Sequence, residues 1–274
     1  MRDLISGYYG FGNLGDEALL SGLTHGLVSR GHVPVVLSGD PAATTALHGV
    51  EAHHRTRGLL GALLSVDALV SGGGGLLQDG TSGRSLRYYL GVIRLARLLG
   101  RMAIVYGQSL GPLSDAGRTR VAAAVRGVPL FVRDEPSRAL AAALGAEAQL
   151  VADPALLLSA PSAPSARGPR PVVLVPRGGQ DTLNMALERL ATRVAAEGRA
   201  VHVASFHPRE DDASVARILA AVPTASATPV ATPAAALETF AGASYVVSVR
   251  LHGCILAARA GVGFAGLSYD GKVS

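Results

Sequence analysis

Histidine and arginine side chains stand directly after short apolar runs in the second half of this sequence. Arg250 and His252 follow one such run, and His207 follows another. An arginine at a helix start adds charge to the positive end of the helix dipole, which costs free energy unless an anion neutralises it. Histidine gains or loses a proton near neutral pH. The pattern predicts an anion site with acid–base groups, although His207 taken alone is equally consistent with a structural role.

Two further arginines end apolar runs and are candidate ligands for a carboxylate or a phosphate. Arg133 follows residues 130–132, and Arg177 precedes two glycines. The planar guanidinium binds either anion through two parallel hydrogen bonds. For Arg133 the alternative is a surface ion pair with Asp134 or Glu135, which would contribute little stability.

The segment 7–17 reads GYYGFGNLGDE and has a G-x-G-x-x-G spacing between the first expected strand and the first expected helix. In dinucleotide-binding folds an acidic residue follows this spacing by about 20 residues and binds the ribose. Asp40 fits that requirement only in part. Asn13 and Asp16 also place an amide and an acid where a pyrophosphate would sit, and the acid repels an anion. Asp16 is therefore either the N-cap of the helix or a group that binds or deprotonates substrate hydroxyls.

A second glycine-rich stretch follows an apolar run and reads GGGGLLQD. Glycine destabilises a fold unless a positive φ or a close approach requires it, so we favour ligand contact by the backbone of Gly73 and Gly74. A tight strand-to-helix turn is the alternative. Gln78 and Asp79, at the end of the stretch, are candidates for binding hydroxyls or accepting their protons. Gln108 occupies a similar strand-to-loop corner and is a further candidate ligand.

Short apolar runs alternate with helical stretches rich in Ala, Leu and Arg, and these elements must position the polar groups. Runs without polar alternation indicate parallel strands that helices bury on both faces. In the first half we expect strands at residues 4–6, 33–37, 68–71, 103–106, 130–132 and 149–152, and helices at 16–30, 85–99, 115–125 and 136–144. In the second half we expect strands at 172–175, 200–205, 245–249 and 263–268, and helices at 182–197, 214–221, 233–241 and 254–260.

Residues 159–171 carry four prolines among small residues and predict a linker. The expected fold is therefore α/β, with two Rossmann-like, doubly wound parallel-sheet domains at residues 1–158 and 172–274. Ligands bind such sheets at the carboxyl ends of the strands, where the polar residues above occur. The second half ends on a strand and a loop, so we expect a closing helix beyond Ser274.

Composition and charge exclude several classes of protein. Hydrophobic residues make up 49% and charged residues 16% of the 274 residues, which excludes a disordered chain, a coiled coil and a collagen-like repeat. The single cysteine, Cys254, excludes an internal disulfide framework, and no spacing of His or Cys predicts a metal site. The net charge of +5 comes from arginines spread along a chain without tryptophan, which argues against a nucleic-acid partner.

Nine strings in this order resemble the polysaccharide pyruvyl transferase family, in particular bacterial enzymes that add pyruvate to the cell-wall polymers anchoring S-layer proteins. They are GYYGFGNLGDEALL (7–20), GGGGLLQD (72–79), YGQSLGPL (106–113), VRDEPS (132–137), ADP (152–154), PRGG (176–179), SFHP (205–208), RLHG (250–253) and SYDGKV (268–273). Together they cover nearly the whole chain. The resemblance implies a GT-B-like fold, in which two Rossmann-like domains face each other across a cleft.

The resemblance also implies an activity, the transfer of a carboxyethylidene group from phosphoenolpyruvate to two hydroxyls of a sugar. Phosphoenolpyruvate would be the donor substrate, with no further cofactor and no metal. The implied donor ligands are the Arg-Leu-His string and the arginine of the Arg-Asp string. Candidate catalytic residues are His252, His207, Asp16 and Asp79. Candidate binding residues are Arg133, Arg177, Arg250, Leu251, Gly73, Gly74, Asn13, Gln78 and Gln108.

The acceptor that the resemblance suggests is a cell-wall glycan or a lipid-linked saccharide that contains N-acetylmannosamine. No leader segment and no uninterrupted stretch of about 20 apolar residues is visible, so we expect a cytoplasmic protein. A lipid-linked acceptor would bring it to the inner face of the membrane. Three alternatives remain: a nucleotide-dependent Rossmann enzyme, a GT-B glycosyltransferase that uses a nucleotide sugar, and a non-catalytic module that binds anions or glycans.

Overall fold

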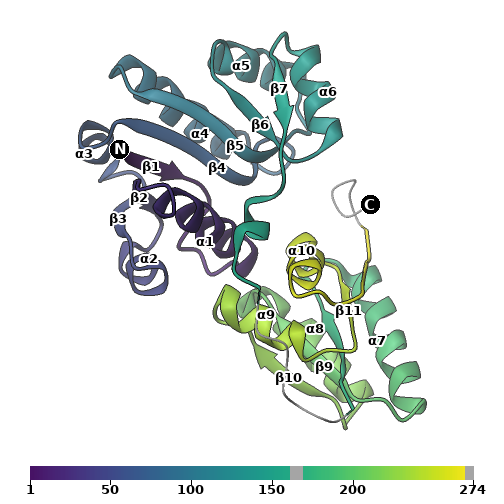
Figure 1. The fold of residues 1–274 in the computed structure, drawn as a ribbon. Helices are drawn as coiled ribbons and strands as arrows, with labels where there is room; N and C mark the ends of the chain where they lie inside the picture. Colours follow the sequence, from purple (N-terminus) through teal and green to yellow (C-terminus); the bar gives the residue numbers. More distant parts are fainter. Residues whose placement is uncertain (161–168, 269–274) are drawn as a thin grey trace. The chain divides into compact units, whose positions relative to one another are not determined.

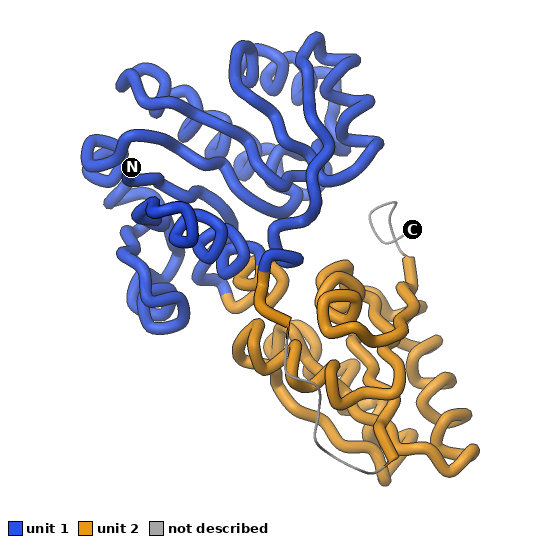
Figure 2. Tube along the Cα trace, in the orientation of Figure 1, with its two compact units in different colours: residues 1–11, 19–157 blue, residues 12–18, 158–274 orange. Residues whose placement is uncertain are grey.

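The computed structural model describes residues 1–160 and 169–268. The chain divides into two compact units, which Figure 2 distinguishes by colour. Unit 1 consists of Met1–Phe11 and Leu19–Leu157, and unit 2 consists of Gly12–Ala18 and the chain from Leu158 onward. Most of the expected linker, residues 161–168, and the end of the SYDGKV string, residues 269–273, lie outside the described residues.

Unit 1 is built on a parallel sheet of seven strands in the order β3-β2-β1-β4-β5-β6-β7 (Figure 1). The strands are β1 (Arg2–Ser6), β2 (Val33–Ser38), β3 (Glu51–His54), β4 (Ala68–Leu77), β5 (Met102–Leu110), β6 (Leu130–Val132) and β7 (Ala148–Leu150). The helices are α1 (Leu14–Val28), α2 (Pro41–His48), α3 (Leu59–Leu64), α4 (Gly83–Leu98), α5 (Asp115–Val125) and α6 (Glu135–Ala143), followed by a 3-10 turn at Pro154–Leu157.

Unit 2 is built on a parallel sheet of five strands in the order β10-β9-β8-β11-β12. The strands are β8 (Val172–Val175), β9 (Val201–Ser205), β10 (Ser226–Pro229), β11 (Tyr245–Ser248) and β12 (Phe264–Gly266). The helices are α7 (Asp181–Ala196), α8 (Pro208–Ala221), α9 (Pro233–Ala241) and α10 (Leu251–Arg259). Both sheets are parallel and alternate with helices, which confirms the predicted α/β class.

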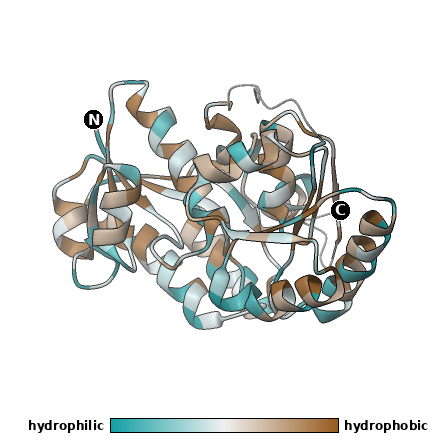
Figure 3. Cartoon of the chain, turned by 90° about the horizontal axis from the view of Figure 1, so that it is seen from below, coloured by the Kyte–Doolittle hydropathy of each residue, from teal (hydrophilic) through white to brown (hydrophobic). Residues whose placement is uncertain are grey.

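Burial on both faces of the central strands explains their continuous apolar sequences. In β1, Leu4 belongs to the cluster that packs under α4 and α5, whereas its neighbour Ile5 packs on the opposite face with α1. Successive side chains of a strand point to opposite faces, so both faces must be covered. The helices carry hydrophilic as well as hydrophobic residues (Figure 3), as expected for helices that rest one side on a sheet.

The expected elements and the observed ones differ chiefly at the sheet edges. The strands β3 and β10 are not predicted from sequence, because their residues EAHH and SATP include few apolar ones and lie at the partly exposed edges of the two sheets. The strand expected at residues 68–71 continues through all four glycines, because β4 runs to Leu77 beside β5. The four glycines are therefore part of a strand, and the interpretation as a strand-to-helix turn is wrong.

Candidate functional site

The carboxylate of Asp211, in the first turn of α8, ties together the carboxyl ends of two strands of unit 2. Its side chain is fully buried. One oxygen, Oδ2, accepts hydrogen bonds from the backbone N–H groups of His207 (2.9 Å) and Phe206 (3.1 Å) and from the Ser205 hydroxyl (3.2 Å). The other, Oδ1, accepts from the N–H of Gly178 at 3.1 Å. The loops that follow β8 and β9 are thereby fixed to one buried charge.

Arg250 supplies the positive partner of that charge. Its Nη2 donates to Asp211 Oδ1 at 2.5 Å, and its Nε donates to the carbonyl of Pro176 at 3.2 Å. A longer contact of 3.5 Å joins Nη2 to Glu210. The Arg250 side chain is only 8% exposed. Within the described residues no hydrogen bond engages Nη1, so this end of a rigidly held guanidinium can receive an anionic ligand.

A tight turn between β11 and α10 presents Arg250, Leu251 and His252. The Ser248 hydroxyl accepts from the N–H of Arg250 at 3.0 Å and donates to the carbonyl of the same residue at 2.7 Å. A Cβ at Gly253 would lie 2.1 Å from that hydroxyl, so only glycine lets the helix start so close to the strand. Leu251 and His252 occupy the first turn of α10, where the helix exposes N–H groups that favour a bound anion.

His207 lies at the N-terminus of α8 beside this pair of charges. Its Nε2 is 3.7 Å from Glu210 Oε1. Its Nδ1 is buried and has no hydrogen-bond partner among the residues that the structure describes. A buried ring nitrogen without a partner is costly, and a substrate atom or a water would satisfy it. The structure therefore brings His207 to the same end of the sheet as Arg250, as the sequence predicts.

The segment Gly12–Ala18 places the start of α1 in this same unit. The N–H of Leu14 donates to the carbonyl of Phe206 at 3.2 Å, and a Cβ at Gly15 would lie 2.5 Å from Nδ1 of His252. The N-cap is Asn13, whose Oδ1 accepts from the N–H of Gly15 at 3.1 Å. Asp16 lies inside the first turn of α1, so its interpretation as the N-cap is wrong, and its acidic side chain remains near the helix start.

Arg177 stands where the sequence places it, directly after β8. Its N–H donates to Asn184 Oδ1 at 3.2 Å, and its carbonyl accepts from Asn184 Nδ2 at 2.6 Å. Asn184 is buried in α7 and also donates to the hydroxyl of Ser214 at 2.8 Å. The side chain of Arg177 is half-buried. A fixed backbone thus orients this arginine at the carboxyl end of the sheet of unit 2.

The candidate residues of unit 1 fall at the carboxyl ends of β4, β5 and β6. Asp79 accepts from the N–H of Ser114 at 2.8 Å and from its hydroxyl at 2.5 Å, next to the start of α5. These hydrogen bonds hold the pKa of the Asp79 carboxyl below its ordinary value. Gln78 closes a local turn, in which its Oε1 accepts from the N–H of Thr81 at 3.0 Å. Both side chains are half-buried.

Arg133 forms a different ion pair from the two that the sequence suggests. Its Nη1 donates to Asp153 at 2.6 Å, and both side chains are nearly buried. Its Nε donates to the Ser109 hydroxyl at 2.9 Å. The surface pair with Asp134 or Glu135 is absent among the described residues, where Asp134 instead caps α6. The binding role of Arg133 stays a prediction, because these contacts show what holds its guanidinium and not what it binds.

Gln108 and Gly73 are both enclosed by protein. Gln108 is fully buried in β5, where its Nε2 donates to the carbonyl and the hydroxyl of Ser71, each at 2.9 Å. Gly73 has a φ of +71°, and a Cβ there would lie 2.9 Å from Cβ of Leu19 in α1. Helix packing thus supplies a structural reason for Gly73. Its neighbour Gly74 also has a positive φ, of +81°. Ligand contact by these residues stays a prediction.

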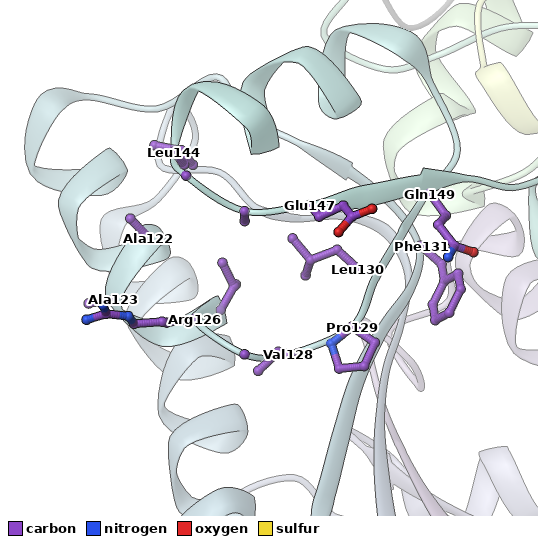
Figure 4. A pocket seen from close by; sticks show the side chains of 14 residues that line it. Ala122, Ala123, Arg126, Val128, Pro129, Leu130, Phe131, Leu144, Glu147 and Gln149 are labelled. Atoms are coloured by element: carbon purple, nitrogen blue, oxygen red, sulfur yellow. The ribbon is translucent and has the colours of Figure 1, made fainter.

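One hollow of unit 1 lies away from all of these residues. It measures about 730 Å³ and lies between α5, β6 and the start of β7. Figure 4 shows Arg126, Glu147 and Gln149 among its mostly apolar lining. None of the residues predicted from sequence lines it. The chemistry-bearing side chains are gathered at the opposite, carboxyl end of β6, so we assign this hollow no role in the reaction.

Sequence reasoning missed Asp211, Asp153 and Asn184. Asp211 belongs to the string HPREDD (207–212), in which three acidic residues stand at the start of a helix. Acidic residues are common there because they interact favourably with the helix dipole, so none of the three stands out. Asp153 belongs to the ADP string but carried no role. The available signal was that a buried arginine at a strand end needs a counter-ion, which can come from a residue far away in the sequence.

No three or more His, Cys, Asp or Glu side chains of the described residues come together as a metal ion would require. Within the same residues, no helix is long and apolar enough to span a bilayer.

The chain matches one protein family in sequence and many solved structures in fold. A family model described as polysaccharide pyruvyl transferase matches residues 13–271. Among curated proteins, none matches this chain in sequence.

Several solved structures share the fold. UDP-GlcNAc 2-epimerase from Neisseria meningitidis, bound to UDP-GlcNAc, matches with a TM-score of 0.60 and 10% identity, covering 97% of this chain and 82% of that one. HepE from Anabaena, in complex with UDP and glucose, has a TM-score of 0.61, 12% identity and coverage of 97% and 80%. ADP-heptose LPS heptosyltransferase II from E. coli has a TM-score of 0.53, 13% identity and coverage of 97% and 84%. At such identities the likeness shows the GT-B-like fold alone.

Proposed function

Because the chain belongs to the polysaccharide pyruvyl transferase family, we propose that it transfers the pyruvyl group of phosphoenolpyruvate to two hydroxyls of a saccharide. Carbon 2 of the donor forms two bonds to sugar oxygens and loses its bond to the phosphate oxygen. The methylene carbon gains one proton and becomes a methyl group. Of the two hydroxyl protons, one balances that gain and the other leaves with inorganic phosphate. The product is a pyruvate ketal.

The observation that carries this proposal is the cluster at the carboxyl ends of β8, β9 and β11. Phosphoenolpyruvate has two anionic groups, a carboxylate and a phosphate, and needs donors held apart to match them. Arg250 and the first turn of α10 offer a guanidinium end and helix N–H groups. Arg177 adds a second guanidinium after β8. Unit 2 is therefore the proposed donor side.

Two histidines supply the proton transfers that ketal formation needs. His252 stands in the first turn of α10, and His207 stands at the start of α8. One acts as the acid that protonates the methylene carbon, and the other takes a proton from an attacking hydroxyl. Asp16, in the first turn of α1, is the alternative base, because Gly15 of the same turn packs against His252. Arg250 stabilises the charge on the departing phosphate.

Unit 1 is the proposed acceptor side. Asp79 is charged at neutral pH, as an ordinary aspartate is, and hydrogen bonds from Ser114 lower its pKa further. In this role it accepts hydrogen bonds from sugar hydroxyls rather than storing a proton. Gln78, beside it, offers amide groups of both polarities. The saccharide is proposed to be a cell-wall glycan or its lipid-linked precursor, which would bring the protein to the inner face of the membrane.

A second candidate function is the transfer of a sugar from a nucleotide sugar. The observation that favours it is the fold, because two of the similar structures hold UDP or UDP-GlcNAc. The two functions differ in the donor. Protection against thermal unfolding by phosphoenolpyruvate, but not by UDP-GlcNAc or UDP-glucose, supports the first; the reverse pattern supports the second.

Phosphate release tests the proposal directly. The purified chain is incubated with phosphoenolpyruvate and a panel of synthetic cell-wall disaccharides, with and without a short lipid. We expect release that depends on both substrates, and its loss in His252→Ala and Arg250→Lys. Matched controls are His202→Ala in β9, whose imidazole bonds Ser226 at 2.8 Å, and Arg217→Lys, which pairs with Glu188 on the surface. Full release by folded His252→Ala would overturn the assignment of that histidine, and no release with any disaccharide would overturn the function.

A further inference from the structure

Four side chains of unit 1 form a stacked column that the proposed chemistry does not use. The rings of Tyr8 and Phe11 lie 4.3 Å apart between centroids and are nearly parallel, at 15°. The Arg55 guanidinium lies 5.4 Å from the centroid of Phe11 and 4.1 Å from that of Tyr88. Cation–π contacts therefore join Arg55 to both rings. We call these four residues the aromatic column.

Backbone contacts at the ends of three strands build the column. The N–H of Gly39 donates to the carbonyl of Tyr9 at 2.9 Å, which fixes the loop after β1 to the loop after β2. A Cβ at Gly39 would lie 2.6 Å from the Phe11 ring, so the ring rests on bare backbone. The N–H of Arg55 donates to the carbonyl of Ser38, and the carbonyl of Arg55 accepts from the Tyr88 hydroxyl at 2.8 Å.

Tyr8 and Phe11 are exposed although their rings are large and apolar. Tyr8 is 41% and Phe11 is 37% exposed, whereas Tyr9 between them is buried and donates to the carbonyl of Gly72 at 2.6 Å. The core of unit 1 therefore buries one aromatic ring of this loop, that of Tyr9, and the rings of Tyr8 and Phe11 stay exposed to solvent. Exposed, preordered aromatic rings beside a cation are typical of binding surfaces.

We propose that the aromatic column binds a sugar ring of the acceptor saccharide by stacking it on Tyr8. This inference rests on the proposed function, which supplies a saccharide substrate. A pyranose has an apolar face of C–H bonds, which packs on an aromatic face, and a rim of hydroxyls, which bond to charged groups. The exposed carboxylate of Asp40, next to Gly39, provides such a group, while Arg55 supports the rings from the other side of Phe11. The patch is small and flanked by charge, which suits a sugar ring better than a long polyprenyl chain.

A pair of reporter variants tests binding without any donor present. The chain contains no tryptophan, so Tyr8→Trp carries a single indole that keeps a stacking ring in the column. The matched control is Tyr245→Trp in β11, because Tyr245 is similarly exposed, at 39%, and lies at the amino end of its strand. We expect saturable changes in the emission of Tyr8→Trp with cell-wall disaccharides and none in Tyr245→Trp. Equal responses in both, or a response of Tyr8→Trp only to uridine diphosphate, would overturn the proposal.

Kinetics separates the column from the donor site. In Tyr8→Ala we expect the KM for the disaccharide to rise about tenfold, the loss of one aromatic stacking contact, while the KM for phosphoenolpyruvate stays unchanged. Tyr245→Ala should leave both constants unchanged. An unchanged KM for the disaccharide in Tyr8→Ala contradicts the inference. If Tyr8→Trp bound disaccharides while the wild-type chain released no phosphate with them, the column would stand and the proposed function would fail.

Discussion

The buried pair of Arg250 and Asp211 is the feature on which the donor site depends, and it predicts a large energetic coupling. In Asp211→Ala the guanidinium, only 8% exposed, loses its counter-ion at 2.5 Å. The N–H groups of Gly178, Phe206 and His207 lose their acceptor in the same step. In Arg250→Met the carboxylate of Asp211 keeps those donors and loses only the cation.

These contacts set the expected magnitudes. Removing one partner of a buried ion pair costs about 3–5 kcal/mol, so we expect Asp211→Ala to lower the free energy of unfolding by about 4 kcal/mol. Arg250→Met should cost about 2 kcal/mol, because the remaining carboxylate still accepts several hydrogen bonds. In the double variant neither charge is left unpaired. Its loss should therefore fall short of the sum of the two single losses by about 2 kcal/mol.

The assay is urea unfolding of the four proteins of this cycle, each carrying Tyr245→Trp. The indole in β11 reports the unfolding of unit 2 separately from unit 1, which matters because the two units need not unfold together. The control cycle uses Arg217 and Glu188, which pair at 2.7 Å but are 45% and 32% exposed. We expect a coupling there of less than about 1 kcal/mol.

Additive losses in the Asp211 and Arg250 cycle, within about 0.5 kcal/mol, would refute the reasoning, because independent sites add and coupled ones do not. Such a result would mean that the guanidinium is not held by this carboxylate in solution. The ordered Nη1 end proposed to receive an anion would then lose its support.

Three further predictions concern a close contact, a strained glycine and the single thiol. In Gly15→Ala the new Cβ would lie 2.5 Å from Nδ1 of His252 and displace the imidazole. We expect kcat for phosphate release to fall at least tenfold while the midpoint of thermal unfolding changes little. An unchanged kcat would contradict the role of His252. In Gly73→Ala the φ of +71° and the contact with Leu19 should lower the free energy of unfolding in urea by about 1–3 kcal/mol. The control Gly91→Ala adds a Cβ that meets open space in α4 and should not lower it. Equal effects of the two substitutions would refute the packing argument. Burial raises the pKa of the Cys254 thiol to about 11. Iodoacetamide should therefore label the folded protein about 100-fold more slowly than the urea-unfolded chain near pH 8, and the labelling rate of the folded protein should rise up to pH 11. Equal labelling rates would contradict the burial of this thiol.

The sequence predicts the interior of the fold better than its margins. Apolar runs at β1, β2 and β8 are buried on both faces, and such runs have one simple interpretation. The edge strands β3 and β10 are polar because one side of each meets solvent, which removes the signal. Glycine is rare in strands, so the sequence favours ligand contact, or alternatively a turn, at the four glycines of β4, whereas the close approach of α1 accounts for Gly72 and Gly73 within the strand.

For the candidate site, the sequence predicts which arginine and histidine residues lie at strand ends, but not which residues they pair with. Placing Arg250, His252 and His207 at strand ends follows from the parallel topology, since all carboxyl ends meet at one edge. The counter-ions Asp211 and Asp153 come from positions 39 and 20 residues away in the chain, so no local pattern reveals them. The membership of Leu14 and Gly15 in unit 2 likewise depends on contacts with Phe206 and His252 that only the fold brings about.

The most direct test of the central claim follows the methylene carbon of the donor. Phosphoenolpyruvate labelled with ¹³C at carbon 3 is incubated with the chain and a cell-wall disaccharide, and the products are examined by NMR and by a phosphate assay. We predict a labelled methyl group attached to the saccharide through a ketal carbon, in a one-to-one ratio with released phosphate. Label that remained in phosphoenolpyruvate, or appeared only in free pyruvate, while a nucleotide sugar was consumed instead, would contradict the account.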